Sequence, residues 1–247
     1  KLRRLLRAQW PYFANVSSVI DGKSVYITRR NLGKELSKLE TEKITKDHIV
    51  VPVPDTSKPS AEALAFELGI PMMEGLIRNR YIGRTFIDGT SRDLMIKNKF
   101  TVIREILKDK KVILVDDSIV RGTTVKQIIN FIKKDGGAKE VHLRITCPAI
   151  MAPCFYGIDM STKSELLAPH YVNAYCGELD FKTCERIAKD LGADSLIYQT
   201  HENLVKSIGL PKNELCMACL NCKYPTEAGK EFYDIALKNF LEKKTED

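Results

Sequence analysis

Cysteine is absent from the first 146 residues of this 247-residue chain, and its seven cysteines begin at Cys147. An odd number of cysteines argues against a framework of disulfides. The chain also lacks any run of about 18 apolar residues, which excludes a transmembrane helix. Its basic start, KLRRLLRAQW, is not followed by the apolar stretch of a signal peptide. We therefore expect a cytoplasmic protein that makes no use of a membrane.

No long block of one charge is present either. Lys and Arg total 39 against 32 for Asp and Glu, which gives a formal net charge of +7. Such scattered basic residues fit a solvated surface or a site for small polyanions, and they give little support for a nucleic-acid partner. The length suits one large α/β domain with extensions, or two small domains.

Apolar periodicity predicts strands that alternate with helices. Helices are expected over 25–39, 60–69, 123–135 and 181–192, and strands over 49–54, 111–115, 140–146 and 195–198. Ser60 is the predicted cap of the second helix and Gly69 its end, and Thr123 or Thr124 is the predicted cap of the third. This order is typical of βαβ units, so we predict a mostly parallel sheet flanked by helices.

The segment VILVDDSIVRGTT (112–124) places two adjacent acids and a small, hydroxyl-rich loop directly after a predicted buried strand. A loop between a strand and a helix N-terminus can bind a phosphate, although the G-x-x-x-x-G-K-[ST] pattern of a P-loop is missing. The acids can accept hydrogen bonds from sugar hydroxyls and bind Mg²⁺. The alternative is an Asp-Asp-Ser turn that only ends the strand.

The same segment resembles the phosphoribosylpyrophosphate (PRPP) signature of the type I phosphoribosyltransferases, and within them of the PRPP amidotransferase family. Further matching segments occur in the order of that family: VPVPDTS (51–57), RNRYIGRTFI (78–87), CFYGIDM (154–160), LGADSLIY (191–198) and YPTE (224–227). The resemblance implies the α/β fold of type I phosphoribosyltransferases with a cysteine-bearing C-terminal extension. We expect a lead-in segment over 1–44, the core over 45–200, and a metal-binding and helical extension over 201–247.

The resemblance also assigns roles to single residues. Asp116 and Asp117 would bind the ribose hydroxyls and, with Thr56, Mg²⁺. The PRPP-binding residues would be Asp55, Thr56, Ser57, Asp116, Asp117, Ser118, Val120, Arg121, Gly122, Thr123 and Thr124. A loop that closes over PRPP would supply the catalytic residues Arg78, Arg80, Tyr81 and Arg84, which neutralise the leaving pyrophosphate. Without the resemblance, this basic segment reads as a solvated hairpin.

The implied reaction is the first step of purine synthesis. Ammonia would displace pyrophosphate from PRPP in a Mg²⁺-dependent transfer, giving 5-phosphoribosylamine. The family's N-terminal glutaminase domain has no counterpart in these residues, so the ammonia is expected to be free or to come from a separate glutaminase subunit. The resemblance further implies a homo-oligomer. The alternative is a non-catalytic regulator with this fold that senses PRPP.

The cysteines suggest a metal centre. Cluster-bearing family members hold a [4Fe–4S] cluster, and Cys154, Cys216 and Cys219 match three of its ligands. The fourth family cysteine is missing, and Cys222 could replace it because C-x2-C-x2-C occurs at iron–sulfur sites. A Zn²⁺ ion on the same four thiolates, or no metal at all, are the alternatives. We read Cys147, Cys176 and Cys184 as ordinary small core residues.

Overall fold

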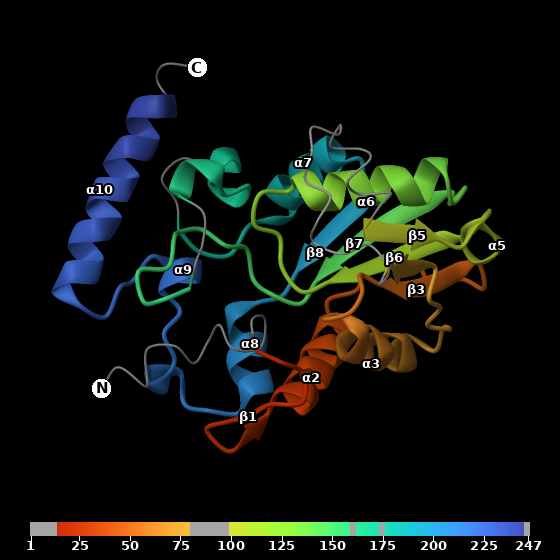
Figure 1. Cartoon of the computed structure of the whole chain (residues 1–247), viewed down its shortest axis with the longest axis horizontal. Coiled ribbons are helices and arrows are strands. Elements are labelled where there is room, and N and C mark those ends of the chain that lie inside the picture. Colours follow the sequence, from red (N-terminus) through yellow and green to blue (C-terminus); the bar gives the residue numbers. More distant parts are fainter. Residues whose placement is uncertain (1–13, 80–98, 159–161, 173–175, 245–247) are drawn as a thin grey trace.

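A parallel sheet of four strands forms the centre of the computed structural model, which describes residues 14–79, 99–158, 162–172 and 176–244. The strands lie in the order β3 (His48–Pro52), β6 (Lys111–Asp116), β7 (Glu140–Ile145) and β8 (Ser195–Tyr198) (Figure 1). One row across the sheet pairs Val51 with Leu114, Leu143 and Leu196 in turn. Short apolar runs of this kind are typical of parallel strands that are covered on both faces.

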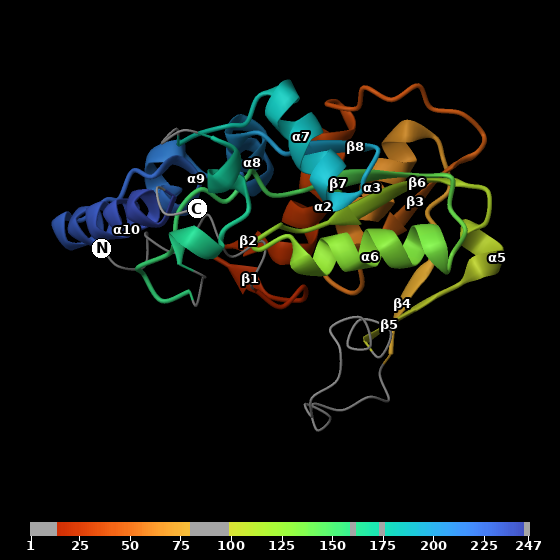
Figure 2. The ribbon, with the colours of Figure 1, turned by 90° about the horizontal axis from the view of Figure 1, so that it is seen from above.

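Helices cover both faces of the sheet, as Figures 1 and 2 show. On one face lie α2 (Val25–Ser37) and α3 (Lys58–Leu68), and on the other α6 (Thr123–Lys134) and α7 (Phe181–Leu191). The predicted apolar face of α6 is confirmed, since all its members are buried: Val125, Ile128, Ile129 and Ile132. The predicted α/β class and parallel sheet are therefore confirmed.

The cap predicted for α3 is wrong. The helix begins one turn earlier than expected, with Ser57 at its N-cap position and Pro59 in its first turn. Ser60 is buried instead, and its hydroxyl donates to the carbonyl of Arg29 on α2 over 2.8 Å. The two helices approach closely because Gly33 has no side chain, and a Cβ atom there would collide with the backbone of Ser60. Gly69 ends α3 in the left-handed conformation, as predicted.

Smaller elements surround the sheet. A hairpin pairs β1 (Val19–Ile20) with β2 (Lys23–Ser24), and a second hairpin pairs β4 (Leu76–Arg78) with β5 (Phe100–Val102). Figure 2 shows this second hairpin projecting away from the sheet. The short helix α5 (Arg104–Leu107) leads into β6.

After β8 the chain is helical. It forms α8 (His201–Ile208), the 3₁₀ turn η4 (Lys212–Glu214), α9 (Ala218–Asn221) and α10 (Glu227–Lys244). Leu204, Ile208 and Leu220 from this region belong to the same core as the central strands. Two further 3₁₀ turns, η2 (Lys163–Glu165) and η3 (Ala168–Tyr171), lie between β7 and α7. Helix α10 lies at one end of the molecule, away from the sheet, and contacts η2 (Figure 1). Among the described residues, no helix is long and apolar enough to cross a bilayer.

Candidate functional site

Two loops that are far apart in sequence meet at the carboxyl edge of the sheet. One follows β3 and contains Pro54 to Ser57, and the other follows Asp116, the last residue of β6. The hydroxyl of Ser57 donates to Oδ1 of Asp116 in a long hydrogen bond of 3.5 Å. Parallel strands bring the ends of their loops to one edge, which is where open α/β sheets bind ligands. The structure thus places the two predicted PRPP-binding segments side by side.

The acidic pair lies at the centre of this edge. Oδ1 of Asp116 accepts from the backbone N–H of Asp117 over 2.8 Å, and Oδ1 of Asp117 accepts from the hydroxyl of Ser118 over 3.1 Å. Burial first, and the charge of Asp117 second, raise the pKa of Asp116 well above its ordinary value. Two carboxylates in one partly buried place repel each other, so a cation between them would stabilise the ionised pair.

The loop after the acids forms a cradle at the start of α6. Gly122 takes the left-handed conformation with φ of 77° and occupies the N-cap position. The predicted capping by Thr123 or Thr124 is therefore wrong, and no side chain caps this helix. The amide groups of the first turn of α6 consequently remain open to an external acceptor, which is the arrangement of helix N-termini that bind phosphate.

Neighbouring segments fix this cradle in place. The backbone N–H of Leu167 donates to the carbonyl of Val120 over 2.8 Å. A Cβ atom at Gly122 would lie 3.1 Å from the side chain of Leu167, so this segment packs against the loop from outside. Arg121 is paired with Glu165 at 3.0 Å. These contacts hold the loop in its shape.

The residues expected to contact pyrophosphate lie in the loop after β3 and at the end of β4. Asp55 and Thr56 are exposed, and the peptide bond between Pro54 and Asp55 is cis. Arg78, at the end of β4, places Nη1 3.8 Å from Oδ2 of Asp55. A cavity of about 480 Å³ lies here, lined by Asp55, Lys58, Arg78 and neighbouring residues. The predicted catalytic residues Arg80, Tyr81 and Arg84 lie outside the described residues.

Two basic residues that the sequence reading missed act on the acidic pair. Lys99, next to β5, lowers the pKa of Asp116 and so opposes the effects of burial and of Asp117. Arg29 on α2 is only 3% exposed; burial lowers its pKa, and the charge of Asp117 counteracts this. An arginine between the apolar positions Val25 and Leu32 of a helix was the available signal for Arg29, whereas nothing in the sequence singles out Lys99.

The four cysteines predicted to bind a metal are not arranged as a metal site among the described residues, although Cys216 and Cys222 pack against the same small cluster. Burial raises the pKa of Cys216, and the neighbouring Cys154 adds to this, so these two lie close to each other. Cys222, however, forms a disulfide with Cys176, with 5.9 Å between the Cα atoms. In the part of the chain that the structure describes, no three Cys, His, Asp or Glu side chains are placed to hold a metal ion.

One cysteine prediction needs correction. Cys222 pairs with Cys176 in this structure, and its role as the fourth thiolate stays a prediction. Cys176 is not an unpaired core residue, and the expectation of a chain without disulfides is wrong at this pair. The two residues are separated by 46 positions in the sequence, so only the tertiary fold brings them together.

Comparison with known proteins identifies the region that forms this edge. Residues 24–151 match the family described as "Phosphoribosyl transferase domain". The chain is 47% identical over 225 residues to amidophosphoribosyltransferase from Methanocaldococcus jannaschii, covering 90% of this chain and 44% of that protein. It is 39% identical over 231 residues to amidophosphoribosyltransferase from Bacillus subtilis, covering 91% of this chain and 45% of that protein.

A solved structure agrees with the sequence relatives. Glutamine PRPP amidotransferase from B. subtilis, complexed with ADP and GMP, superimposes with a TM-score of 0.76 at 40% identity. The match covers 90% of this chain and 47% of that one. The chain thus spans a little less than half the length of the relatives that it matches.

Proposed function

Since this chain belongs to the phosphoribosyltransferase family and its relatives are amidophosphoribosyltransferases, we propose that it transfers the phosphoribosyl group of PRPP to ammonia. The products would be 5-phosphoribosylamine and pyrophosphate, and the reaction would be the first step of purine synthesis. One observation supports this proposal: the hydroxyl of Ser57 donates to Asp116 over 3.5 Å, so the loop after β3 lies beside the acidic pair that ends β6.

The donor set at this pair fits a magnesium ion. The Asp116 carboxyl is half-buried and repelled by Asp117, and its pKa is raised for both reasons. A hard divalent cation with oxygen ligands would relieve this repulsion. Asp116, Asp117 and Thr56 would hold the ion, directly or through water. Bound Mg²⁺ would supply positive charge for the pyrophosphate that leaves.

The residues of the chain itself would bind and orient PRPP. Loop 118–122 and the open amide groups at the start of α6 would hold the 5′-phosphate, and the acidic pair would accept hydrogen bonds from the ribose hydroxyls. Arg78 lies beside the pyrophosphate loop, and we propose that Arg80, Tyr81 and Arg84 complete the charge around the leaving group. Such a site acts chiefly by position and electrostatics, so we assign no general base.

The source of the nitrogen is a further part of the proposal. Free ammonia, or ammonia delivered by a separate glutaminase subunit, would attack C1 of the ribose as pyrophosphate leaves. Assembly into a homo-oligomer stays a prediction. A [4Fe–4S] cluster or Zn²⁺ on Cys154, Cys216, Cys219 and Cys222 also stays a prediction.

The direct test is an assay of PRPP consumption with Mg²⁺, comparing ammonium chloride with glutamine as nitrogen source. We expect pyrophosphate release that requires both Mg²⁺ and ammonium. Binding of PRPP without turnover under either condition would contradict the enzymatic proposal and favour a PRPP-sensing regulator. Turnover that appears only after a glutaminase is added would retain the reaction and assign the ammonia to a partner.

A further inference from the structure

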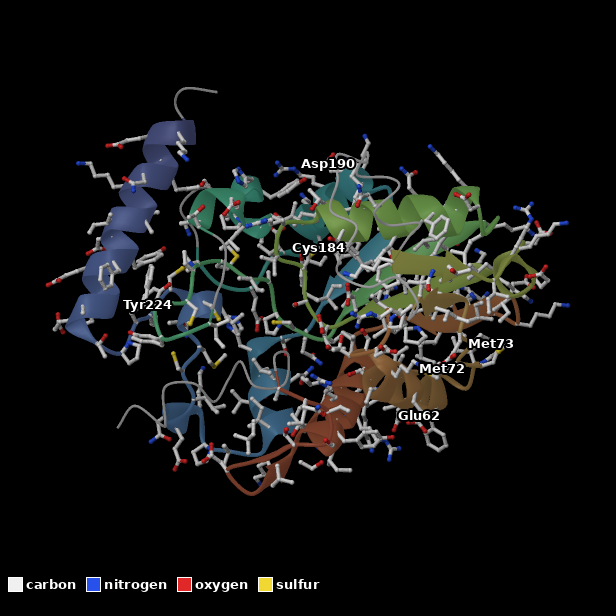
Figure 3. All side chains as sticks on the ribbon, in the orientation of Figure 1. Glu62, Met72, Met73, Cys184, Asp190 and Tyr224 are labelled. Atoms are coloured by element: carbon white, nitrogen blue, oxygen red, sulfur yellow. A yellow bond between two sulfur atoms is a disulfide. The ribbon has the colours of Figure 1, made fainter. Side chains whose placement is uncertain are left out.

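A second cavity lies against the C-terminal helix. It has a volume of about 680 Å³ and is lined by α10 and by segments 153–155 and 162–164. Figure 1 shows α10 standing apart from the sheet, and Figure 3 labels Tyr224 near the start of this helix. The volume is in the range of small-molecule sites. None of its lining residues belongs to the loops that we assign to PRPP.

Three phenylalanines form most of the apolar wall. Phe155 comes from the segment before η2, and Phe232 and Phe240 come from α10. Phe155 and Phe232 face each other with ring centroids 5.6 Å apart. Phe232 is 55% exposed although it is a large apolar residue. Covering such a surface with an apolar group lowers the free energy of the system.

One buried cation interrupts this apolar surface. Lys163 is only 4% exposed, and its Nζ donates to the carbonyl of Met151 over 2.7 Å. The same nitrogen lies 5.3 Å from the ring centroid of Tyr233 and 5.6 Å from that of Phe240. Among the residues described, no carboxylate pairs with it. Burial lowers the pKa of Lys163 to about 8, so the amine is still mainly protonated at pH 7.

The charge of Lys163 determines which ligand the cavity favours. An ammonium group has three donors, and one carbonyl with two ring faces leaves it without a counter-ion. A buried charge of this kind is stabilised by an anion that brings its own hydrogen-bond acceptors. The other charged side chains at the lining are Glu242 and Lys243, which are of opposite sign and both on the last turns of α10.

We propose that this cavity, the Lys163 cavity, binds a small organic anion that consists of one carboxylate on a planar aromatic body. The phenylalanine walls suit the aromatic body, and the Lys163 ammonium suits the carboxylate. A phosphate group would need several more hydrogen-bond donors than Lys163 and the nearby hydroxyls of Thr162 and Ser164 provide. This site is separate from the proposed transferase reaction and does not depend on it.

The test compares a charged probe with its neutral analogue. We would measure binding of 2-naphthoate and 2-naphthamide to the whole chain by isothermal titration calorimetry at pH 7. Naphthoate is expected to bind at least about tenfold more tightly, as a charge-assisted hydrogen bond implies. In Lys163→Met this preference should disappear, and in Lys238→Met, which alters an exposed lysine of α10, it should persist.

A second variant keeps the test independent of the folding of Lys163→Met. Phe232→Ala removes an exposed wall residue and is expected to weaken both probes by a similar factor. Equal affinities of the wild type for the two probes would overturn the proposal, as would a charge preference that survives Lys163→Met. An absence of naphthoate binding would also overturn it, and would point to an acidic side chain of a protein partner as the occupant.

Discussion

Arg144 on β7 and Glu40, in the loop before β3, form a buried ion pair with two hydrogen bonds. Nε of Arg144 donates to Oε2 of Glu40 over 2.8 Å, and Nη2 donates to Oε1 over 2.6 Å. The Arg144 side chain is fully buried, and that of Glu40 is 5% exposed. Neither partner can be removed without leaving an uncompensated charge inside the protein.

We therefore expect Glu40→Ala and Arg144→Ala each to lower the free energy of unfolding by about 3 to 5 kcal/mol. Chemical denaturation followed by circular dichroism would measure this. The exposed pair of Lys230 and Glu227 is a control, because Lys230→Ala should leave the midpoint unchanged. A loss for Arg144→Ala as small as that for Lys230→Ala would contradict the importance of the buried pair.

The same pair predicts a pH dependence. Burial raises the pKa of Glu40, but the hydrogen bonds and charge of Arg144 outweigh it and hold the pKa below the ordinary value of 4.5. Between the lowered pKa of the folded state and 4.5, the folded protein therefore binds fewer protons than the unfolded chain. The stability that Glu40 contributes is complete above pH 4.5 and is lost as the pH falls through the folded-state pKa. Wild type and Glu40→Gln should differ most near pH 7 and converge towards pH 3. Parallel curves from pH 7 to pH 3 would show that Glu40 titrates alike in both states.

Asp116→Asn and Asp117→Asn test the acidic pair. Each should lower kcat/KM for PRPP by about 100-fold or more, because an electrostatic contact with the reacting ligand is lost. The fold should persist, since the change at Asp116 also relieves the repulsion between two acids. Steady-state assays with thermal melts would separate the two effects, and the exposed Asp47→Asn is the matched control. Wild-type rates in either site variant would contradict the assignment of this loop.

The disulfide between Cys176 and Cys222 predicts sensitivity to reductant. It closes a loop of 46 positions, for which the chain-entropy estimate is about 4 kcal/mol. Dithiothreitol should lower the denaturation midpoint of the wild type. The double variant Cys176→Ser, Cys222→Ser should unfold at that lower midpoint and show no response to the reductant. If reduced and oxidised wild type unfold alike, the bond does not stabilise the fold.

Much of the fold could be predicted from local patterns. The four apolar runs of the central strands and the apolar face of α6 have the periods of their elements, so composition and spacing were sufficient. The cap of α3 was less predictable, because Ser60 is buried by packing against Arg29 and Gly33 of another helix. The pairing of Arg144 with Glu40 likewise depends on the tertiary fold, since 104 positions separate them.

The candidate site, like the fold, could be predicted only in part from the sequence. The carboxyl ends of parallel strands share one edge, so the meeting of Ser57 with Asp116 followed from topology. The charges of Lys99 and Arg29 reach the acids only through the arrangement of β5 and α2, which no local pattern contains. The partner of Cys222 was missed for a related reason, because spacing in C-x2-C-x2-C suggested a metal and gave no information about Cys176.

The hydrogen bond from Leu167 to the carbonyl of Val120 has a consequence for the thermodynamics of ligand association. Because this bond and the packing of Leu167 on Gly122 already fix the phosphate loop, the conformational entropy of ordering that loop is lost during folding rather than on binding. A phosphate that enters the cradle then loses mainly its own freedom of motion, which favours affinity. If this loop binds phosphate as we propose, Leu167 would contribute to the affinity from outside the binding surface.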